Sequence, residues 1–221
     1  ASEWSEMGEH AFAAMLMPNI VWRAGKPAEQ VRLAAYMCLE KLLATGHVTG
    51  EQLANRAAEA LPLFVSGLDD DNVETRRLVC KVLAVAISLL GAQHIDHDQM
   101  RLLYPELTKR LDDSSDVVRV AACVPLIAML RAVRYSASWS QTHNFDRTNF
   151  IYFLQGLLVH LDDPSPEIQA EVQAVLEFAA PMDPPEFCNQ LRLVRDRHRS
   201  PKLCNLLIEK AGSIPPGGTL V

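Results

Sequence analysis

Residues 110–123 read RLDDSSDVVRVAAC. Two serines that can start a helix follow the acidic pair, and Arg119 stands six residues after Asp113. Carboxylates and hydroxyls beside an arginine suit a metal or phosphate site, and they equally suit a structural joint between two helices. The recurrence of this stretch along the chain decides between these interpretations.

Related stretches occur at spacings of 44, 43 and 50 residues. The acidic turns read LDDD at 68–71 and LDDP at 161–164, and a degenerate copy, KPAEQVR, stands at 26–32. Each turn leads into an apolar run with helical periodicity, and the first three turns follow a proline by eight residues: Pro18, Pro62 and Pro105. Features that keep one register predict an array of repeated helical pairs.

The composition supports a helical protein. Hydrophobic residues make up 49% of the 221 residues and aromatic residues 6%, with Ala, Leu and Val dominant, so a β-sandwich or barrel is not favoured. The formal charge of −6 opposes non-specific nucleic-acid binding. No apolar run approaches the roughly 20 residues that cross a bilayer. No signal-peptide pattern opens the chain, so we expect a cytoplasmic protein without a membrane partner.

The repeats predict a single solenoid over residues 1–212 with a flexible tail at 213–221. In the second unit, Thr49 or Gly50 is expected to start one helix through residue 67, and Asp71 or Asn72 to cap the next. Cysteines within the apolar runs, Cys38 among them, are predicted to be buried reduced thiols. The expected units are 3–46, 49–91, 96–134 and 148–180, with closing helices at 184–212.

The repeated pattern resembles HEAT repeats, which are antiparallel helix pairs stacked into a right-handed solenoid. In that family a proline in the first helix precedes an Asp in the turn and an Arg or Lys six residues later. The second and third units match at all three positions, whereas Lys26 replaces the acid in the first, and Gln155 and Gln169 replace the proline and arginine in the fourth. The resemblance covers roughly residues 3–180 and implies the fold more specifically than the function.

Within that family the chain is similar to the C-terminal part of HEAT-repeat dynein axonemal assembly factors. The stretches LDDSSDVVRVAACVPL (111–126) and RDRHRSPKLCNLLIEKA (195–211) carry this resemblance. It implies a cytoplasmic, non-catalytic factor without a cofactor, whose partners are other proteins: dynein chains and chaperones or co-chaperones. The alternatives are a HEAT adaptor in transport or phosphatase assembly, and a HEAT-fold enzyme that acts on nucleic acid or through a metal.

The recurring acid and base are predicted to form a structural ladder. An Asp in the turn lies near the positive end of the second helix and can accept its free N–H groups. An Arg one turn into that helix can reach the Asp of the adjacent repeat with a two-pronged hydrogen bond. Consecutive aspartates that precede a helix fan outward and do not converge on a metal. The predicted ladder residues are Asp70, Arg76, Asp113, Arg119 and Asp163.

The sequence predicts no catalytic residue and no metal ligand. His94 and His97 stand beside Asp96, but a loop or cap explains them better than a cation site. HEAT-fold hydroxylases use repeated His-Glu pairs, and here a single pair is present, at Glu9 and His10. No nucleophile motif or phosphate-binding glycine loop is present.

Partner-binding candidates come from three places. Glu74, Arg77 and Lys81 share one face of a second helix, which lines the concave side in the HEAT family. Their equivalents one repeat later are valines, and a mixed charged and apolar surface suits a protein partner better than DNA. The other candidates are Trp139 in the long loop at 135–147, and Arg195, Arg197 and Arg199 in the basic closing stretch. The oligomeric state is left open by the sequence.

Overall fold

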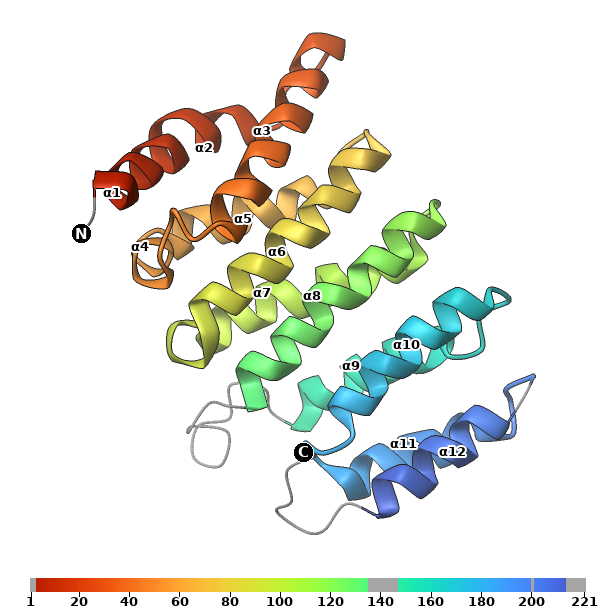
Figure 1. Cartoon of the computed structure of the whole chain (residues 1–221). Helices are drawn as coiled ribbons and strands as arrows, with labels where there is room; N and C mark the ends of the chain where they lie inside the picture. Colours follow the sequence, from red (N-terminus) through yellow and green to blue (C-terminus); the bar gives the residue numbers. More distant parts are fainter. Residues whose placement is uncertain (1–2, 135–146, 200, 214–221) are drawn as a thin grey trace. The chain divides into compact units, whose positions relative to one another are not determined.

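The computed structural model describes residues 3–134, 147–199 and 201–213, and every regular element within these ranges is a helix (Figure 1). The predicted all-α class is thereby confirmed. The chain divides into two compact units, Ala1–Ala137 and Ser138–Val221. The continuity of one solenoid over residues 1–212 stays a prediction.

The first unit is built from two layers of helices. In one layer α3, α6 and α8 pack side by side, and in the other α2 packs on α5 and α5 on α7 (Figure 1). Each helix of the second layer also packs on its partner in the first, which gives three stacked helical pairs. The bounds are α1 (Glu3–His10), a π-helical segment (Ala11–Leu16), α2 (Met17–Ile20), α3 (Lys26–Ala44), α4 (Gly50–Ala54), α5 (Ala57–Gly67), α6 (Val73–His94), α7 (His97–Lys109), a 3-10 turn (Arg110–Asp112) and α8 (Asp116–Arg134).

Side-chain caps start α4, α6 and α7, and those of α4 and α6 lie at the predicted places. Thr49 Oγ1 accepts from the Gln52 N–H at 3.2 Å while the Gln52 side chain accepts from the Thr49 N–H at 2.9 Å, a reciprocal box that begins α4. Asp96 caps α7 in the same way with Gln99. Asn72 accepts from two N–H groups at the start of α6. These caps satisfy donors that a helix otherwise leaves unpaired.

Two expectations about this unit are wrong. The single helix expected to run through residue 67 is broken, because Arg56 has φ −119° and ψ 5° and separates α4 from α5. Cys38 was expected in the core but is exposed on α3. Its neighbours in the helix, Tyr36 and Leu39, take the buried positions instead, so Cys38 lies on the outward face of the same turn.

The second unit repeats the paired arrangement. Its helices are α9 (Arg147–His160), α10 (Pro166–Ala179), α11 (Pro184–Arg195) and α12 (Lys202–Gly212). α9 packs on α10 and on α11, and α12 packs on α11 and on α10. Proline stands in the first turn of α10 and α11. Backbone N–H groups in a first turn have no carbonyl partner within the helix, so the lack of an N–H in proline costs no hydrogen bond there.

A close approach between α4 and α6 gives a test of this packing. A Cβ built on Gly50 would lie 2.2 Å from the backbone carbonyl oxygen of Leu89, which a side-chain rotation cannot relieve. We expect Gly50→Ala to lower the free energy of unfolding by about 1–3 kcal/mol, measured by urea denaturation followed by circular dichroism. Gly212→Ala is the control, because a Cβ there meets nothing within 4 Å. Equal stability of the two variants would contradict the close packing of α4 on α6.

Candidate functional site

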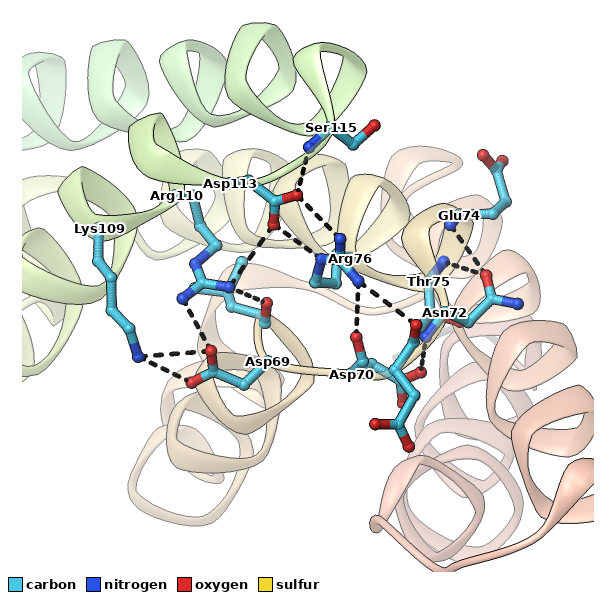
Figure 2. A network of polar contacts seen from close by, with 12 residues as sticks. Asp69, Asp70, Asn72, Glu74, Thr75, Arg76, Lys109, Arg110, Asp113 and Ser115 are labelled. Atoms are coloured by element: carbon cyan, nitrogen blue, oxygen red, sulfur yellow. Dashed lines mark hydrogen bonds and ion pairs between the residues drawn. The ribbon is translucent and has the colours of Figure 1, made fainter. Parts of the chain in front are cut away.

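Arg76 ties its own turn to the turn of the next repeat (Figure 2). Its Nε donates to Oδ2 of Asp113 and its Nη2 donates to Oδ1, both at 2.8 Å. Its Nη1 donates to the backbone carbonyl oxygen of Asp70 at 2.9 Å. The two side chains of the ion pair are 10% and 3% exposed, so this charge-assisted, two-pronged contact is largely shielded from water.

The preceding repeat makes the equivalent contact. Arg32 Nε donates to Oδ2 of Asp70 at 2.6 Å, and Arg32 Nη1 donates to the backbone carbonyl oxygen of Arg23 at 2.6 Å. Both partners of this ion pair are buried. Each arginine therefore bonds to a carbonyl near its own turn and to the carboxylate of the following turn.

The same carboxylates have a second role within their own turns. Oδ1 of each turn Asp accepts from the backbone N–H two residues further on, at 2.8–3.0 Å, which fixes the turn before the next helix. The three pairs are Asp70 with Asn72, Asp113 with Ser115, and Asp163 with Ser165. The recurrence of one geometry in three turns explains why the sequence repeats an Asp there.

Arg119 lies at the corresponding place in the third repeat. Its Nε donates to the carbonyl oxygen of Leu111 at 2.7 Å, and its Nη1 bonds to Asp116 at 3.2 Å. Asp163 belongs to the second unit, so the expected pairing of Arg119 with Asp163 stays a prediction.

A second polar contact between repeats was missed by the sequence analysis. Arg110 Nη1 donates to the carbonyl oxygen of Leu68 at 2.7 Å, and its Nη2 lies 2.7 Å from Oδ1 of Asp69 (Figure 2). Lys109 adds an exposed ion pair to the same Asp69 carboxylate at 3.2 Å. The acceptor is a backbone carbonyl 42 residues before Arg110 in the chain, so the stretch RLDD alone did not reveal this contact.

The environment of Asp113 favours its charged form. Burial raises the pKa of this carboxyl group, but the hydrogen bonds from Arg76 and from the Ser115 N–H outweigh burial and hold the pKa below its ordinary value. The hydrogen bond to Asp113 likewise raises the pKa of Arg76, against the effect of burial. The pair is therefore ionised at neutral pH, as a structural joint requires.

The predicted binding residues of the second helix border an open groove between α3 and α6. The groove has a volume of about 750 Å³. Glu74, Arg77 and Lys81 line it from α6, and Arg77 Nε donates to Oε2 of Glu74 at 2.8 Å. From α3 it is lined by Met37 and Cys38, so charged and apolar side chains meet in this groove, and its role in binding a partner stays a prediction.

The remaining candidates are distributed differently. Trp139 lies outside the described residues. Arg195 bonds to the adjacent Asp196 at 2.8 Å, and Arg199 donates to the backbone and side chain of Asp162. Arg197 is exposed in the loop after α11. Two of these three arginines are thus already engaged within the second unit.

The described residues show no cluster of three or more His, Cys, Asp or Glu side chains that could hold a metal ion. Cys204 Sγ lies 3.3 Å from His198 Nδ1, but Cys204 is buried and burial raises its pKa, so the thiol keeps its proton. Within the described ranges, no helix is both long and apolar enough to span a bilayer.

Three curated proteins resemble the chain in sequence. Dynein axonemal assembly factor 5 of Xenopus laevis is 32% identical over 194 residues, which cover 88% of this chain and 22% of that protein. The Homo sapiens protein of the same name is 30% identical over 201 residues, which cover 91% of this chain and 23% of that protein. The chain thus spans less than a quarter of the length of these relatives. No family model matches it.

Solved structures with a similar fold are helical repeat proteins. A computationally designed armadillo repeat protein for modular peptide recognition has a TM-score of 0.56 at 18% identity, over 95% of this chain and 89% of that chain. A designed armadillo repeat protein in complex with the peptide (KR)4 also has a TM-score of 0.56 at 18% identity, over 95% and 88% of the two chains. The predicted α-solenoid class is confirmed.

The ladder contact predicts a stability difference between two aspartates. Asp113→Asn removes a charge from the shielded pair with Arg76 and should lower the free energy of unfolding by about 2–4 kcal/mol. Asp196→Asn is the matched control, because its ion pair with Arg195 has the same 2.8 Å separation but is exposed to solvent. That variant should leave the free energy of unfolding, measured by urea denaturation, close to the wild-type value. Equal losses would show that burial does not strengthen the joint.

The lowered pKa of Asp113 also predicts a dependence on pH. The pKa of the Asp113 carboxyl group in the folded protein is below its value of about 3.9 in the unfolded chain. Such a group stabilises the fold fully above the unfolded-state pKa, and this stabilisation is lost as the pH falls through the folded-state pKa. The stability difference between the wild type and Asp113→Asn should therefore be largest near neutral pH and shrink in acid. Urea denaturation over a pH series measures it, and a constant difference down to about pH 2 would contradict the assignment.

Proposed function

Across about nine-tenths of its length the chain is a homologue of dynein axonemal assembly factor 5, and from this premise we propose that it is a non-catalytic scaffold in the preassembly of axonemal dynein arms. Because the chain spans less than a quarter of those relatives, the proposal concerns one segment of such a factor. Preassembly of this kind takes place in the cytoplasm, and the expected partners are dynein chains together with chaperones or co-chaperones.

The observation that carries the proposal is the outward face of the layer α3, α6 and α8. The polar joints lie in the turns, while exposed apolar side chains lie along the helices of this layer: Met37 is 54% exposed, Val117 55% and Val124 51%. Exposed apolar residues interspersed with charges are typical of surfaces that bind other proteins. The groove between α3 and α6 adds a concave region to this face.

The fold itself supports binding of an extended partner. Stacked helical repeats present a row of similar positions, so one partner chain can contact several repeats in succession. A structural neighbour of this kind was solved in complex with the peptide (KR)4. We propose that this chain also binds a protein ligand on its repeat surface. The preference for a basic peptide is a property of that designed protein.

A capture experiment tests the proposal. The tagged chain, expressed in ciliated cells, should recover axonemal dynein chains and chaperones, identified by mass spectrometry. Val117→Asp places a charge on the outward face of α8 and should reduce the recovery of dynein chains at least several-fold. The same substitution at Val159, which is 70% exposed on α9, is the matched control and should leave recovery unchanged.

Both variants must keep the wild-type melting temperature for this comparison to hold, and their exposed positions favour that outcome. Failure of the wild-type chain to recover any dynein chain would contradict the proposed function. Equal recovery by the two valine variants would instead move the binding surface away from α8.

A further inference from the structure

Three equivalent positions form a row across the outward face of the first unit. Met37, Lys81 and Val124 each stand five residues after the ladder arginine of their repeat, at spacings of 44 and 43 residues. They lie on α3, α6 and α8, which pack side by side in one layer (Figure 1). All three side chains are exposed, so the row offers an apolar, a cationic and an apolar group in that order.

The cation in this row is available to a partner. Within the described residues, Lys81 makes no hydrogen bond or ion pair, although it lines the same groove as Met37. The neighbouring charges are already matched: Glu74 is bonded to Arg77, and Glu40 pairs with Lys41 at 3.0 Å. The charge of Lys81 acts on Glu74 without a direct bond, so an acidic group on a ligand can form the close ion pair that Lys81 does not make within the described residues.

The spacing of the row selects the shape of that ligand. Packed helices lie about 8–10 Å apart, so three equivalent positions on adjacent helices repeat at about that interval. A polyproline II segment rises about 3.1 Å per residue with three residues per turn, so every third side chain points the same way at intervals of about 9 Å. A β-strand would turn alternate residues to opposite faces and present every third side chain on the wrong side.

We propose that the row Met37, Lys81 and Val124 binds a linear segment of a partner protein in the polyproline II conformation, with apolar, acidic and apolar residues at positions i, i+3 and i+6. The segment crosses α3, α6 and α8 and places its acidic side chain against Lys81. This proposal rests on the proposed scaffold function, and it specifies which kind of partner segment binds to the outward face of α3, α6 and α8.

The charges around the row argue for an acidic peptide rather than a nucleic acid. A phosphate backbone needs several cations in a stripe, whereas the groove that Lys81 lines also contains Glu74 and Glu40. Apolar groups at both ends of the row suit aliphatic side chains and would leave phosphates unpaired. One carboxylate between two apolar residues satisfies all three positions.

A labelled peptide with the core Leu-Pro-Pro-Glu-Pro-Pro-Leu tests the proposal by fluorescence anisotropy at low salt. We expect the full chain to bind it more tightly than the same peptide with Gln in place of Glu. Lys81→Glu should weaken binding of the Glu peptide about tenfold, because attraction becomes repulsion. The same variant should bind a peptide with a central Lys more tightly than the wild type does.

Arg101→Glu is the matched control, since it makes the same change in charge at an exposed position on α7, in the other layer. It should leave peptide binding within about twofold of the wild type. Val124→Ser should weaken binding of the Glu and Gln peptides alike, because it removes an apolar contact and no charge.

Equal affinity of the wild type for the Glu and Gln peptides, or no binding of either, would overturn the proposal. An effect of Arg101→Glu as large as that of Lys81→Glu would also overturn it, because it would reflect net charge alone. If the Lys81→Glu variant recovers dynein chains from cells at the wild-type level, the proposed binding row is wrong, whereas the proposed scaffold function is unaffected. If the wild type binds the peptide but recovers no dynein chain from cells, the proposed scaffold function in dynein arm preassembly is wrong, whereas the binding row is supported.

Discussion

The carboxylate of Asp113 receives the guanidinium of Arg76 from the repeat before it and the N–H of Ser115 from its own turn. Because one acidic group both starts a helix and holds a neighbouring repeat, the helical pairs cannot shift against each other without leaving a shielded charge unpaired. Asp70 is used in the same way by Arg32. The side-by-side packing of α3, α6 and α8, and hence the face that they present, follows from this constraint.

Joint and binding surface are separated in the molecule. The paired Asp and Arg residues of the joint lie in the turns and near the starts of the helices that follow, and they are shielded, whereas the charged and apolar side chains that can meet a partner lie further along the helices. The residues that stand out most in the sequence therefore report how the protein is built. In the proposed binding mode its specificity resides in positions such as Lys81 and Val124, which look ordinary in the sequence and differ from one repeat to the next.

Much of the fold followed from the sequence because its signals are local. An acid at a fixed distance from a proline and an arginine marks the turns of the second and third units, and caps such as Asp96 mark helix starts. The break at Arg56 and the exposure of Cys38 did not follow, because both depend on which side of a helix meets its neighbours. The Arg110 contact was missed for another reason: one of its acceptors is a backbone carbonyl 42 residues away, and every residue has such a carbonyl, so no sequence pattern marks it.

The polar contacts in the turns also have a mechanical meaning. Arg32 bonds to the side chain of Asp70, whose backbone carbonyl accepts from Arg76, which in turn grips Asp113. These bonds form a continuous chain of polar contacts through three repeats along the row of turns. The first two repeats are also bonded at the other end of their helices, where the side chain of Gln52 donates to Glu9 at 3.2 Å, so a pulling force along the stack would meet polar contacts at both ends.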